Sequence, residues 1–196
     1  MGGRVNYGTY EQDGDTKNGA ETIEWEVLAV EKDRVLLVSR YCLDVAPYHS
    51  SADGTDWAGS SVRTWLNEVF FLDAFSAKEQ DTVLLTELVN ENNQSFGTNG
   101  GENTMDRVFL LSESEVSAYY KSAEERVLTA TKYAQKQGVQ VYKVKKNSEV
   151  CEWWLRTPGG DIGTAIYVQQ GGTLAIKGGR LQLGVIGVRP AIWVKK

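Results

Sequence analysis

The amino-acid sequence predicts an α+β fold with mixed and antiparallel sheets and a few short helices. Strand patterns come first along the chain, helix-capping patterns and a long polar loop follow, and only strand and turn patterns remain from Trp153 onward. Regularly alternating strands and helices would instead indicate βαβ units around a parallel sheet. Because the two kinds of pattern are largely separated along this chain, the α+β class is favoured.

The composition is typical of a globular protein with a sizeable core. We expect one domain over residues 1–196, with 41% hydrophobic and 24% charged residues. The net charge of −5 and the lack of a Lys/Arg stripe argue against nucleic acid as the main partner. The basic run of Lys143, Lys145 and Lys146 is interpreted as a solvated strand end.

The N-terminal region predicts a hairpin turn followed by two strands. Asn18-Gly19 favours a tight turn. Residues Ile23 to Val30 alternate, with Ile23, Trp25, Val27 and Ala29 expected on one face, and Arg34 to Ser39 form a continuous apolar run typical of a buried strand. Asp13 and Asp15 resemble part of a calcium loop. Lys17 stands where a ligand oxygen is needed and no Glu follows at the twelfth position, so no metal is expected.

The middle of the chain carries the helical signals. Ser60 or Ser61 can cap a helix with one apolar face. That face is predicted to contain Val62, Trp65, Leu66, Val69 and Phe70. Ser76 with Glu79 and Ser112 with Glu115 have the spacing of capping boxes. Thr131 to Gln137 predicts a short helix that ends at Gly138.

Three further segments are predicted around these helices. Asn90 to Asn103 is rich in Asn and Gly and predicts a long surface loop. Arg107 to Leu111 and Val139 to Val144 have strand patterns.

The C-terminal quarter consists of two aromatic blocks that bracket a changeable segment. The blocks are Trp153–Gly159 and Gly187–Trp193. The strands predicted after the first block are Ala165–Val168, Thr173–Ile176 and Val188–Val194, with turns at Gly171-Gly172 and Gly178-Gly179. In the first of these strands, Tyr167 and Gln169 should project to one side and Ile166 and Val168 to the other.

Arginine and tryptophan side chains in the two blocks are expected to have structural roles. An unpaired guanidinium is costly to bury, so Arg156 and Arg189 should bind carbonyl oxygens or a carboxylate and lock loops together. Recognition of an anionic ligand is the alternative for either arginine. The other residues expected to be structural are Trp153, Trp154 and Trp193.

The sequence offers little that predicts catalysis. It lacks a phosphate-binding glycine loop, a dinucleotide fingerprint and a Gly-x-Ser-x-Gly motif. Asp53 and Asp56 are close in sequence but have no evident third partner. The single histidine, His49, excludes multi-histidine metal sites and disfavours a histidine-based triad. We therefore expect no catalytic residues, no metal and no cofactor.

The two cysteines, Cys42 and Cys151, are too few for a disulfide framework. Two buried free thiols are favoured over a single bridge. Cys151 as a nucleophile is disfavoured, because no basic residue lies near it in sequence and burial among aromatic residues raises a thiol pKa.

The two C-terminal blocks, Trp-Trp-Leu-Arg-Thr-Pro-Gly and Gly-Val-Arg-Pro-Ala-Ile-Trp, resemble an uncharacterised bacterial family. Its members typically read WWLRSPG and GVRPALW and carry domain of unknown function 6273. Thr157 and Gly171 depart from the usual Ser and Asp, and Cys42 replaces a small residue. Further segments that fit the resemblance are Gly8–Tyr10, Ile23–Trp25, Leu43–Tyr48, Arg63–Asn67, Ala165 with Val168, and Val108–Ser112.

The resemblance implies a C-type-lectin-like fold, similar to the variable proteins of diversity-generating retroelements and to the formylglycine-generating-enzyme superfamily. In the variable proteins, the stretch before the last strand varies and forms the ligand face. We therefore expect residues 153–193 to carry a non-catalytic site for a protein or glycan ligand, with residues 160–186 as its surface. The expected ligand-binding residues are Asp161, Ile162, Thr164, Tyr167, Gln169, Lys177, Arg180 and Gln182.

Two alternatives stay open beside this hypothesis. One is an enzyme related to the sulfatase-modifying superfamily, although its cysteine pair is not matched by Cys151 alone. The other is a structural module of a larger surface or phage protein. No apolar run approaches the roughly 20 residues that span a bilayer, and Met1–Arg4 does not resemble a signal peptide. Membrane insertion by this chain is therefore not expected, whereas a location on a cell surface or phage particle, or elsewhere, and the oligomeric state are left open.

Overall fold

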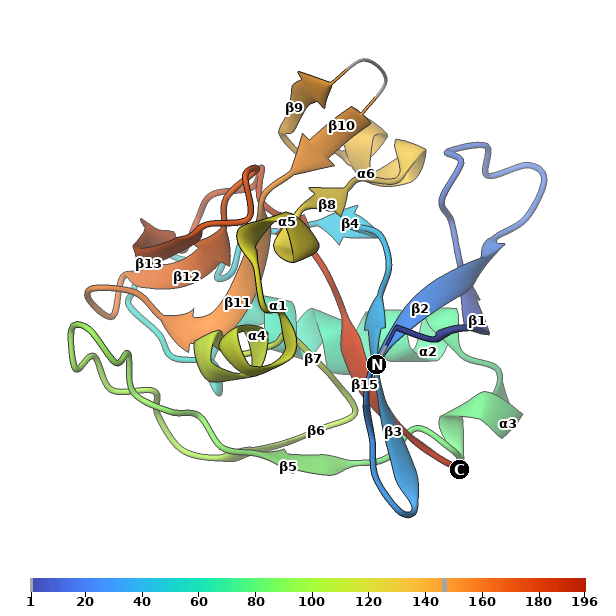
Figure 1. Ribbon diagram of the computed structural model, residues 1–196, viewed down its shortest axis with the longest axis horizontal. Helices are drawn as coiled ribbons and strands as arrows, with labels where there is room; N and C mark the ends of the chain where they lie inside the picture. The colour runs from blue at the N-terminus through green and yellow to red at the C-terminus, as the bar shows by residue number, and fades with distance from the viewer. Residues whose placement is uncertain (1, 146–147) are drawn as a thin grey trace.

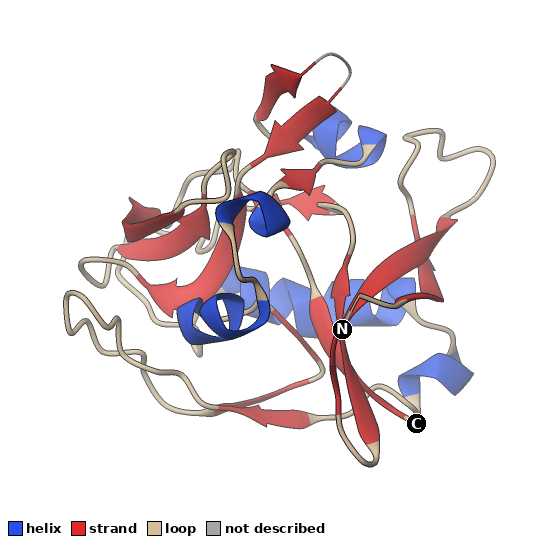
Figure 2. Cartoon of the chain, in the orientation of Figure 1, coloured by secondary structure: helices blue, strands red, loops and turns tan. Residues whose placement is uncertain are grey.

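The computed structural model describes residues 2–145 and 148–196, and it has an α+β fold (Figure 1). Short helices lie around several sheets (Figure 2). The strands are β1 (Arg4–Tyr10), β2 (Glu21–Val30), β3 (Arg34–Ser39), β4 (Asp44–Val45), β5 (Thr86–Leu88), β6 (Thr104–Asp106), β7 (Val108–Phe109), β8 (Leu128–Thr129), β9 (Val141–Lys145), β10 (Ser148–Cys151), β11 (Trp153–Pro158), β12 (Thr164–Val168), β13 (Leu174–Arg180), β14 (Gly187–Val188) and β15 (Ala191–Lys195). The helices are α1 (Ser61–Trp65), the π-helix η1 (Leu66–Phe70), α2 (Phe71–Ala74), α3 (Ala77–Gln80), α4 (Glu113–Tyr119), α5 (Ala123–Arg126) and α6 (Lys132–Gln137).

The first sheet joins both ends of the chain. Its strand order is β1-β2-β3-β15-β7, and all pairs are antiparallel. The C-terminal strand β15 lies between β3 and β7, with Trp193 paired to Leu36. β3 lies between β2 and β15, at the centre of this sheet. Its central position explains its continuous apolar run, which was predicted with the bounds observed.

The second sheet positions the C-terminal segment. Its order is β13-β12-β11-β14-β4, and it is mixed because β11 and β14 run parallel. β13 is one of its two edge strands, so one side of β13 has no strand partner in this sheet. Two small sheets complete the described structure, β8-β10-β9 and β5-β6.

The prediction of one strand from Val188 to Val194 is wrong. The chain leaves the second sheet after β14 and enters the first sheet at β15, and Arg189-Pro190 lies at the crossing. Proline has no backbone N–H to contribute to a ladder, while its carbonyl accepts a bond from the Ser39 backbone N–H at 2.9 Å. The second aromatic block therefore connects the two large sheets.

The prediction of a turn at Gly178-Gly179 is also wrong, because both glycines lie inside β13. The pairing of β12 with β13 shifts register between Ala165 and Tyr167, which is typical of a bulge. Gly178 has φ +82°, and a Cβ there would lie 2.7 Å from the Ala165 carbonyl oxygen. The glycine pair thus permits a bulged strand instead of ending one. The other predicted turn, Gly171-Gly172, is confirmed.

The helix after Ser60 was predicted correctly at its start, since the Ser60 side chain accepts from the Arg63 N–H. Its apolar face was predicted incorrectly at Val69, which is 45% exposed. α1, η1 and α2 follow one another without a break, and the π-helical turn adds residues to the repeat. Phe70, the last residue of η1, and Phe71, the first residue of α2, are buried, whereas Val69 points to solvent.

Two strand predictions and one turn prediction need correction. The expected face of Ile23, Trp25, Val27 and Ala29 ends at a bulge after Val27, beyond which Leu28 is buried. The Arg107–Leu111 segment is buried from Val108 onward, but only Val108 and Phe109 form a strand. Asn18-Gly19 does not make a tight hairpin, since β1 and β2 are joined by the longer loop 11–20.

The remaining local predictions agree closely with the structure. Both capping boxes form, and Gly138 ends α6 with φ +110°. Residues 90–103 form an extended loop between β5 and β6. The predicted strand Val139–Val144 is displaced to Val141–Lys145. Within the basic run Lys143 is exposed, whereas Lys146 lies outside the described residues.

One cluster of buried apolar residues extends from Ile23 to Val194 and unites the two large sheets. Cys42 and Cys151 belong to it as buried free thiols, which confirms the favoured prediction. A hydrogen bond from the Cys151 thiol to the Cys42 sulfur and burial together raise the pKa of Cys151. Among the described residues no helix has both the length and the apolar character to cross a membrane.

Candidate functional site

The candidate site begins at the first aromatic block, which forms β11. All residues from Trp153 to Gly159 are buried. The indole Nε1 of Trp153 donates to the Arg126 carbonyl oxygen and that of Trp154 to the Ala46 carbonyl oxygen, each at 3.0 Å. The block is therefore tied to two different parts of the chain.

Arg156 binds groups from three separate segments. Its guanidinium donates to the carbonyl oxygens of Leu110 at 2.9 Å and Val89 at 3.4 Å, and to Glu115 Oε1 at 3.0 Å. The side chain is only 4% exposed. These contacts use the guanidinium inside the protein, so they leave little of it for an external anion.

Arg189 is used in a similar way at the crossing between the sheets. Its Nε donates to the Ser39 carbonyl oxygen at 2.9 Å and its Nη2 to Glu26 Oε2 at 3.0 Å. The guanidinium also lies 4.9 Å from the centre of the Trp153 ring, within the range of a cation–π contact. Trp193, in the same block, is 8% exposed and lies under the guanidinium of Arg34.

The turn after the first block contains three of the predicted ligand-binding residues. Thr164 Oγ1 donates to the Asp161 carbonyl oxygen at 2.9 Å, and Asp161 Oδ1 accepts from the Gly163 N–H at 2.9 Å. Ile162 is 59% exposed at the tip, while its carbonyl oxygen accepts from the Thr55 N–H at 3.1 Å. Asp161 and Thr164 thus shape the turn, and Ile162 is the side chain that the turn presents.

The predicted ligand-binding residues on or next to β12 and β13 lie in two places. Arg180 pairs with Thr164 and lies at the end of the sheet that holds the turn. Lys177 packs over Gly160, whose Cβ position would lie 3.2 Å from Lys177 Cγ. Tyr167 lies towards the opposite end of β12, where it pairs with Ala175, and Gln169 directly follows that strand.

The alternation predicted for β12 holds, because Ile166 and Val168 are completely buried whereas Tyr167 is half-buried. The Tyr167 ring packs edge-on against Trp154, with ring centres 6.0 Å apart. Tyr167 is therefore anchored on the first aromatic block while part of its ring faces solvent.

The segment from Leu181 to Val185 forms another wall of the site. The Leu181 carbonyl oxygen accepts from the His49 N–H at 3.0 Å, and the Gln182 side chain donates to the Ser51 carbonyl oxygen. Leu183 and Val185 are 39% and 42% exposed. Gln182 is exposed, but its side-chain amide already donates a hydrogen bond within the protein. Leu183 and Val185 add exposed apolar surface that was not predicted.

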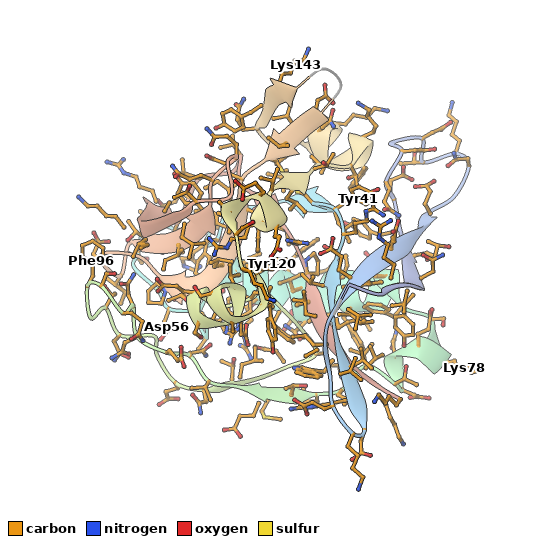
Figure 3. The ribbon with its side chains drawn as sticks, viewed as in Figure 1. Tyr41, Asp56, Lys78, Phe96, Tyr120 and Lys143 are labelled. Atoms are coloured by element: carbon orange, nitrogen blue, oxygen red, sulfur yellow. The ribbon has the colours of Figure 1, made fainter. Side chains whose placement is uncertain are left out.

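The 90–103 loop also reaches the site, which sequence reasoning missed. Asn93 is 1% exposed, and its Nδ2 donates to the carbonyl oxygens of Pro158 at 2.9 Å and Ile176 at 3.1 Å. The loop then presents Phe96 (Figure 3), which is 52% exposed. A Cβ at Gly160 would lie 3.8 Å from Phe96 Cδ1, so the two residues are neighbours. The Asn/Gly-rich composition indicated a loop, but nothing in it indicated where the loop docks.

Two polar residues at the junction of β9, β10 and β11 were missed as well. Glu152 and Tyr142 are half-buried. Burial raises the pKa of Glu152, and the Tyr142 hydroxyl and the Gln170 N–H oppose that shift by hydrogen bonding. Glu152 lies between buried Cys151 and Trp153 in the sequence. Alternation along an extended chain therefore predicts only that its side chain points away from the face that contains those two side chains.

The described residues that resemble catalytic groups by residue type are His49, Asp53 and Asp56, and each makes local structural contacts. His49 Nδ1 accepts from the Ser61 backbone N–H at 3.3 Å and lies 3.0 Å from Ser61 Oγ, at the start of α1. Asp53 accepts from the Ser51 hydroxyl and Asp56 from the Gly59 N–H, both at 3.1 Å. These two carboxylates serve separate local turns and do not act as a pair.

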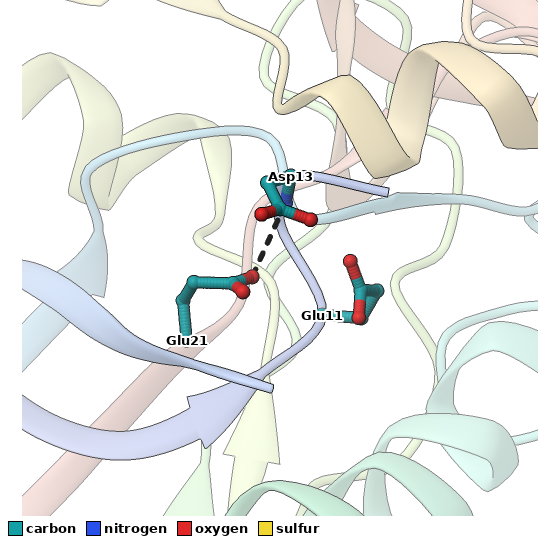
Figure 4. A group of neighbouring side chains, drawn as sticks. All are labelled: Glu11, Asp13 and Glu21. Atoms are coloured by element: carbon teal, nitrogen blue, oxygen red, sulfur yellow. Dashed lines mark hydrogen bonds between the residues drawn. The ribbon is translucent and has the colours of Figure 1, made fainter. Parts of the chain in front are cut away.

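A group of three carboxylates lies at the loop between β1 and β2 (Figure 4). Glu21 Oε2 accepts from the Gln12 N–H at 2.7 Å and the Asp13 N–H at 3.2 Å, and Glu11 Oε1 accepts from the Gly14 N–H at 2.6 Å. Lys136 Nζ donates to the Gly14 carbonyl oxygen at 2.7 Å. The carboxylates therefore close the loop, and a lysine ammonium already contributes positive charge beside them.

Comparison with known proteins gives a family but no characterised relative. No curated protein and no solved structure matches the chain. The family model described as a domain of unknown function, DUF6273, matches residues 32–196. This match covers most of the chain, including both aromatic blocks and the segment between them. The protein therefore belongs to the DUF6273 family.

Proposed function

We propose that this protein is a non-catalytic recognition domain whose ligand-binding face is formed by residues 160–186. In this proposal the fold is C-type-lectin-like, and the protein is related to the variable proteins of diversity-generating retroelements. Its ligand is a protein or a glycan. The predicted ligand-binding residues contribute unequally, because Asp161 and Thr164 also shape a turn and Gln182 also binds Ser51.

The observation that carries the proposal is the distribution of burial. Every residue from Trp153 to Gly159 and every residue from Ile186 to Val194 is buried. Exposed side chains between these blocks include Asp161, Ile162, Lys177, Arg180 and Gln182. Substitutions at such positions usually change stability by less than about 0.5 kcal/mol, so this segment can change its surface while the blocks maintain the fold.

The exposed apolar side chains around the same segment support recognition of a ligand. Phe96, Ile162, Leu183 and Val185 are each more than a third exposed, and Phe96 and Ile162 project from loops tied to the second sheet. In this proposal the four side chains add apolar contact area to the face, since large contiguous apolar patches are typical of interaction sites. The buried Cys151, whose pKa is raised, does not favour the alternative of a cysteine-dependent sulfatase-modifying enzyme.

A display library tests the proposal. Residues 161, 164, 167, 169, 177, 180 and 182 are varied together, and folded members are selected against panels of bacterial surface proteins and glycans. We expect different members to capture different ligands. Capture of one ligand by all members, or of none by any member, would contradict the proposal. A reverse transcriptase gene and a template repeat beside the gene would separately support diversification of this copy.

A further inference from the structure

The turn at residues 160–164 lies beside two basic positions of the edge strand β13. At the start of the turn, the Gly160 N–H donates to the Lys177 carbonyl oxygen at 2.8 Å. At its end, Thr164 pairs with Arg180. Backbone contacts therefore place Lys177 and Arg180 at the two ends of one turn, and both side chains are exposed there.

Neither Lys177 nor Arg180 forms an ion pair among the residues that the structure describes. Residues 1 and 144–148, whose side chains the structure does not describe, contain no carboxylate. Every other arginine of the chain donates a hydrogen bond or forms an ion pair. This contrast arises although the chain has 26 acidic and only 21 basic side chains. The two cations are therefore free to bind carboxylates of a ligand.

Carboxylates of the turn and of the loop that contacts it accept hydrogen bonds within their own segments. Asp161 Oδ1 accepts from the Gly163 N–H at 2.9 Å, and Asp53 accepts from the Ser51 hydroxyl at 3.1 Å. These negative charges reduce the net positive charge around the turn. We therefore expect ligand selection to depend on direct contacts with the two cations, because exposed charges further apart are screened by salt.

Two exposed apolar side chains border the same turn. Ile162 is 59% exposed at its tip, and Phe96 is 52% exposed. A Cβ at Gly160 would lie 3.8 Å from Phe96 Cδ1 and 3.2 Å from Lys177 Cγ, so the aromatic ring and the lysine stem both border Gly160. Asn93 ties the loop of Phe96 to the second sheet through two hydrogen bonds. Apolar area and cations thus lie together on backbone segments that are fixed before binding, which lowers the cost of ordering them.

We propose that this surface binds an acidic segment of a protein ligand. Carboxylates of the ligand bind Lys177 and Arg180, and an apolar side chain of the ligand contacts Phe96 and Ile162. A guanidinium can bind a carboxylate through two hydrogen bonds, whereas an ammonium acts as a point charge. The inference rests on the proposed recognition function, names the chemistry of its ligand, and adds Phe96 to the ligand-binding face formed by residues 160–186.

A protein segment fits this surface better than an acidic sugar does. An acidic sugar could place its carboxylate on Arg180 and its ring on Phe96. Ile162, however, offers no hydrogen bond to a sugar hydroxyl, and a hydroxyl that loses water without gaining a partner is costly to bury. An aliphatic side chain of a protein gains from the same contact. The acidic sugar is therefore the competing outcome of the test.

The test is an NMR titration of the full chain with small probes. The acidic probe is the capped tripeptide Glu-Leu-Glu, its neutral match is Gln-Leu-Gln, its match without the apolar side chain is Glu-Gly-Glu, and methyl glucuronide is the acidic sugar. We expect the acidic probe to shift the backbone signals of Phe96, Lys177 and Arg180. It should bind about fivefold more tightly than Gln-Leu-Gln, because exposed ion pairs are individually weak, and also more tightly than Glu-Gly-Glu. Added salt should reduce the first difference.

Matched variants separate this surface from general electrostatics and from misfolding. Lys177→Gln and Arg180→Gln should each weaken the acidic probe about threefold, whereas Lys32→Gln, which removes an exposed cation between β2 and β3, should not. Phe96→Ala should weaken the probe, whereas Leu72→Ala, at a position that is 58% exposed, should not. Unchanged backbone signals away from the substituted site establish that each variant is folded.

Three results would overturn the acidic-ligand assignment, and none depends on the library selection. They are equal binding of Glu-Leu-Glu and Gln-Leu-Gln, equal loss in Arg180→Gln and Lys32→Gln, and tighter binding of methyl glucuronide than of the acidic tripeptide. Library-selected ligands without a preference for the acidic tripeptide would reject the assignment and preserve the recognition function. The preference without any library-selected ligand would preserve the assignment and reject the variable recognition face.

Discussion

Arg180 lies in the segment between the two aromatic blocks and Arg189 lies in the second block, and their side chains have different surroundings. Arg189 is 2% exposed and binds the Ser39 carbonyl oxygen and Glu26. Arg180 is exposed at the end of β13. The same residue type thus joins two sheets in one region and remains on the surface in the other. Burial and partners, more than residue identity, distinguish the blocks from the segment between them.

The largest expected difference between the two regions is seen by removing these arginines. We expect Arg189→Ala to lower the free energy of unfolding by about 2–4 kcal/mol, because it strands buried acceptors and leaves a cavity beside Trp153. Arg180→Ala should change it by less than about 0.5 kcal/mol. Urea denaturation measures both. Equal effects of the two substitutions would remove the distinction between block and segment.

Gly178→Ala tests a position inside the segment between the blocks where we expect a substitution to destabilise the fold. The residue has φ +82°, and a new Cβ would meet the Ala165 carbonyl oxygen, so we expect a loss of about 1–3 kcal/mol. Gly171→Ala is the control, since a Cβ there meets nothing within 4 Å. Thermal unfolding compares the two. A harmless Gly178→Ala would show that the bulge in β13 is not required.

Asn93→Ala tests whether the Asn93 side chain anchors the 90–103 loop to the second sheet. Loss of its amide leaves the Pro158 and Ile176 carbonyl oxygens without their donor, which should cost about 1–2 kcal/mol. Faster hydrogen exchange should appear in residues 90–103. Asn103→Ala, at an exposed position of the same loop, is the matched control, and an identical exchange pattern in both variants would contradict the anchoring role.

The smallest effect concerns Glu152 and depends on pH. Burial raises its folded-state pKa, so its favourable contribution to stability is present at low pH and is lost as pH rises through that pKa. Glu152→Gln should therefore match the wild type at low pH and become slightly more stable at higher pH, by less than about 0.5 kcal/mol because the site is partly solvated. Unfolding curves across pH measure the difference. A variant that is less stable only at high pH would contradict this account.

Local features were predictable where one short stretch of sequence determines them. The capping pairs Ser76–Glu79 and Ser112–Glu115 and the strand Arg34–Ser39 were predicted because hydrogen bonding or burial acts over neighbouring residues. Val69 and Gly178 were misjudged because a π-helical turn and a bulge change the repeat on which the prediction depended.

Only the features of the candidate site that depend on neighbouring residues in the sequence were predictable. The alternation of Ile166 and Tyr167 indicated which side chains leave the core, and the two aromatic blocks indicated where the continuously buried stretches lie. Phe96 reaches the same region because its loop docks through Asn93, and Tyr142 is placed by the pairing of β9 with β10. Those contacts depend on register and on Asn93, which no local pattern specifies.

The central claim is that the two blocks carry the fold while the segment between them carries the surface. It is tested most directly by comparing two libraries for the fraction of members that resist protease. One library varies the seven segment positions 161, 164, 167, 169, 177, 180 and 182, and the other varies seven buried positions in the two blocks. We expect most members of the first library to fold and few members of the second. Similar folded fractions in the two libraries would contradict the claim.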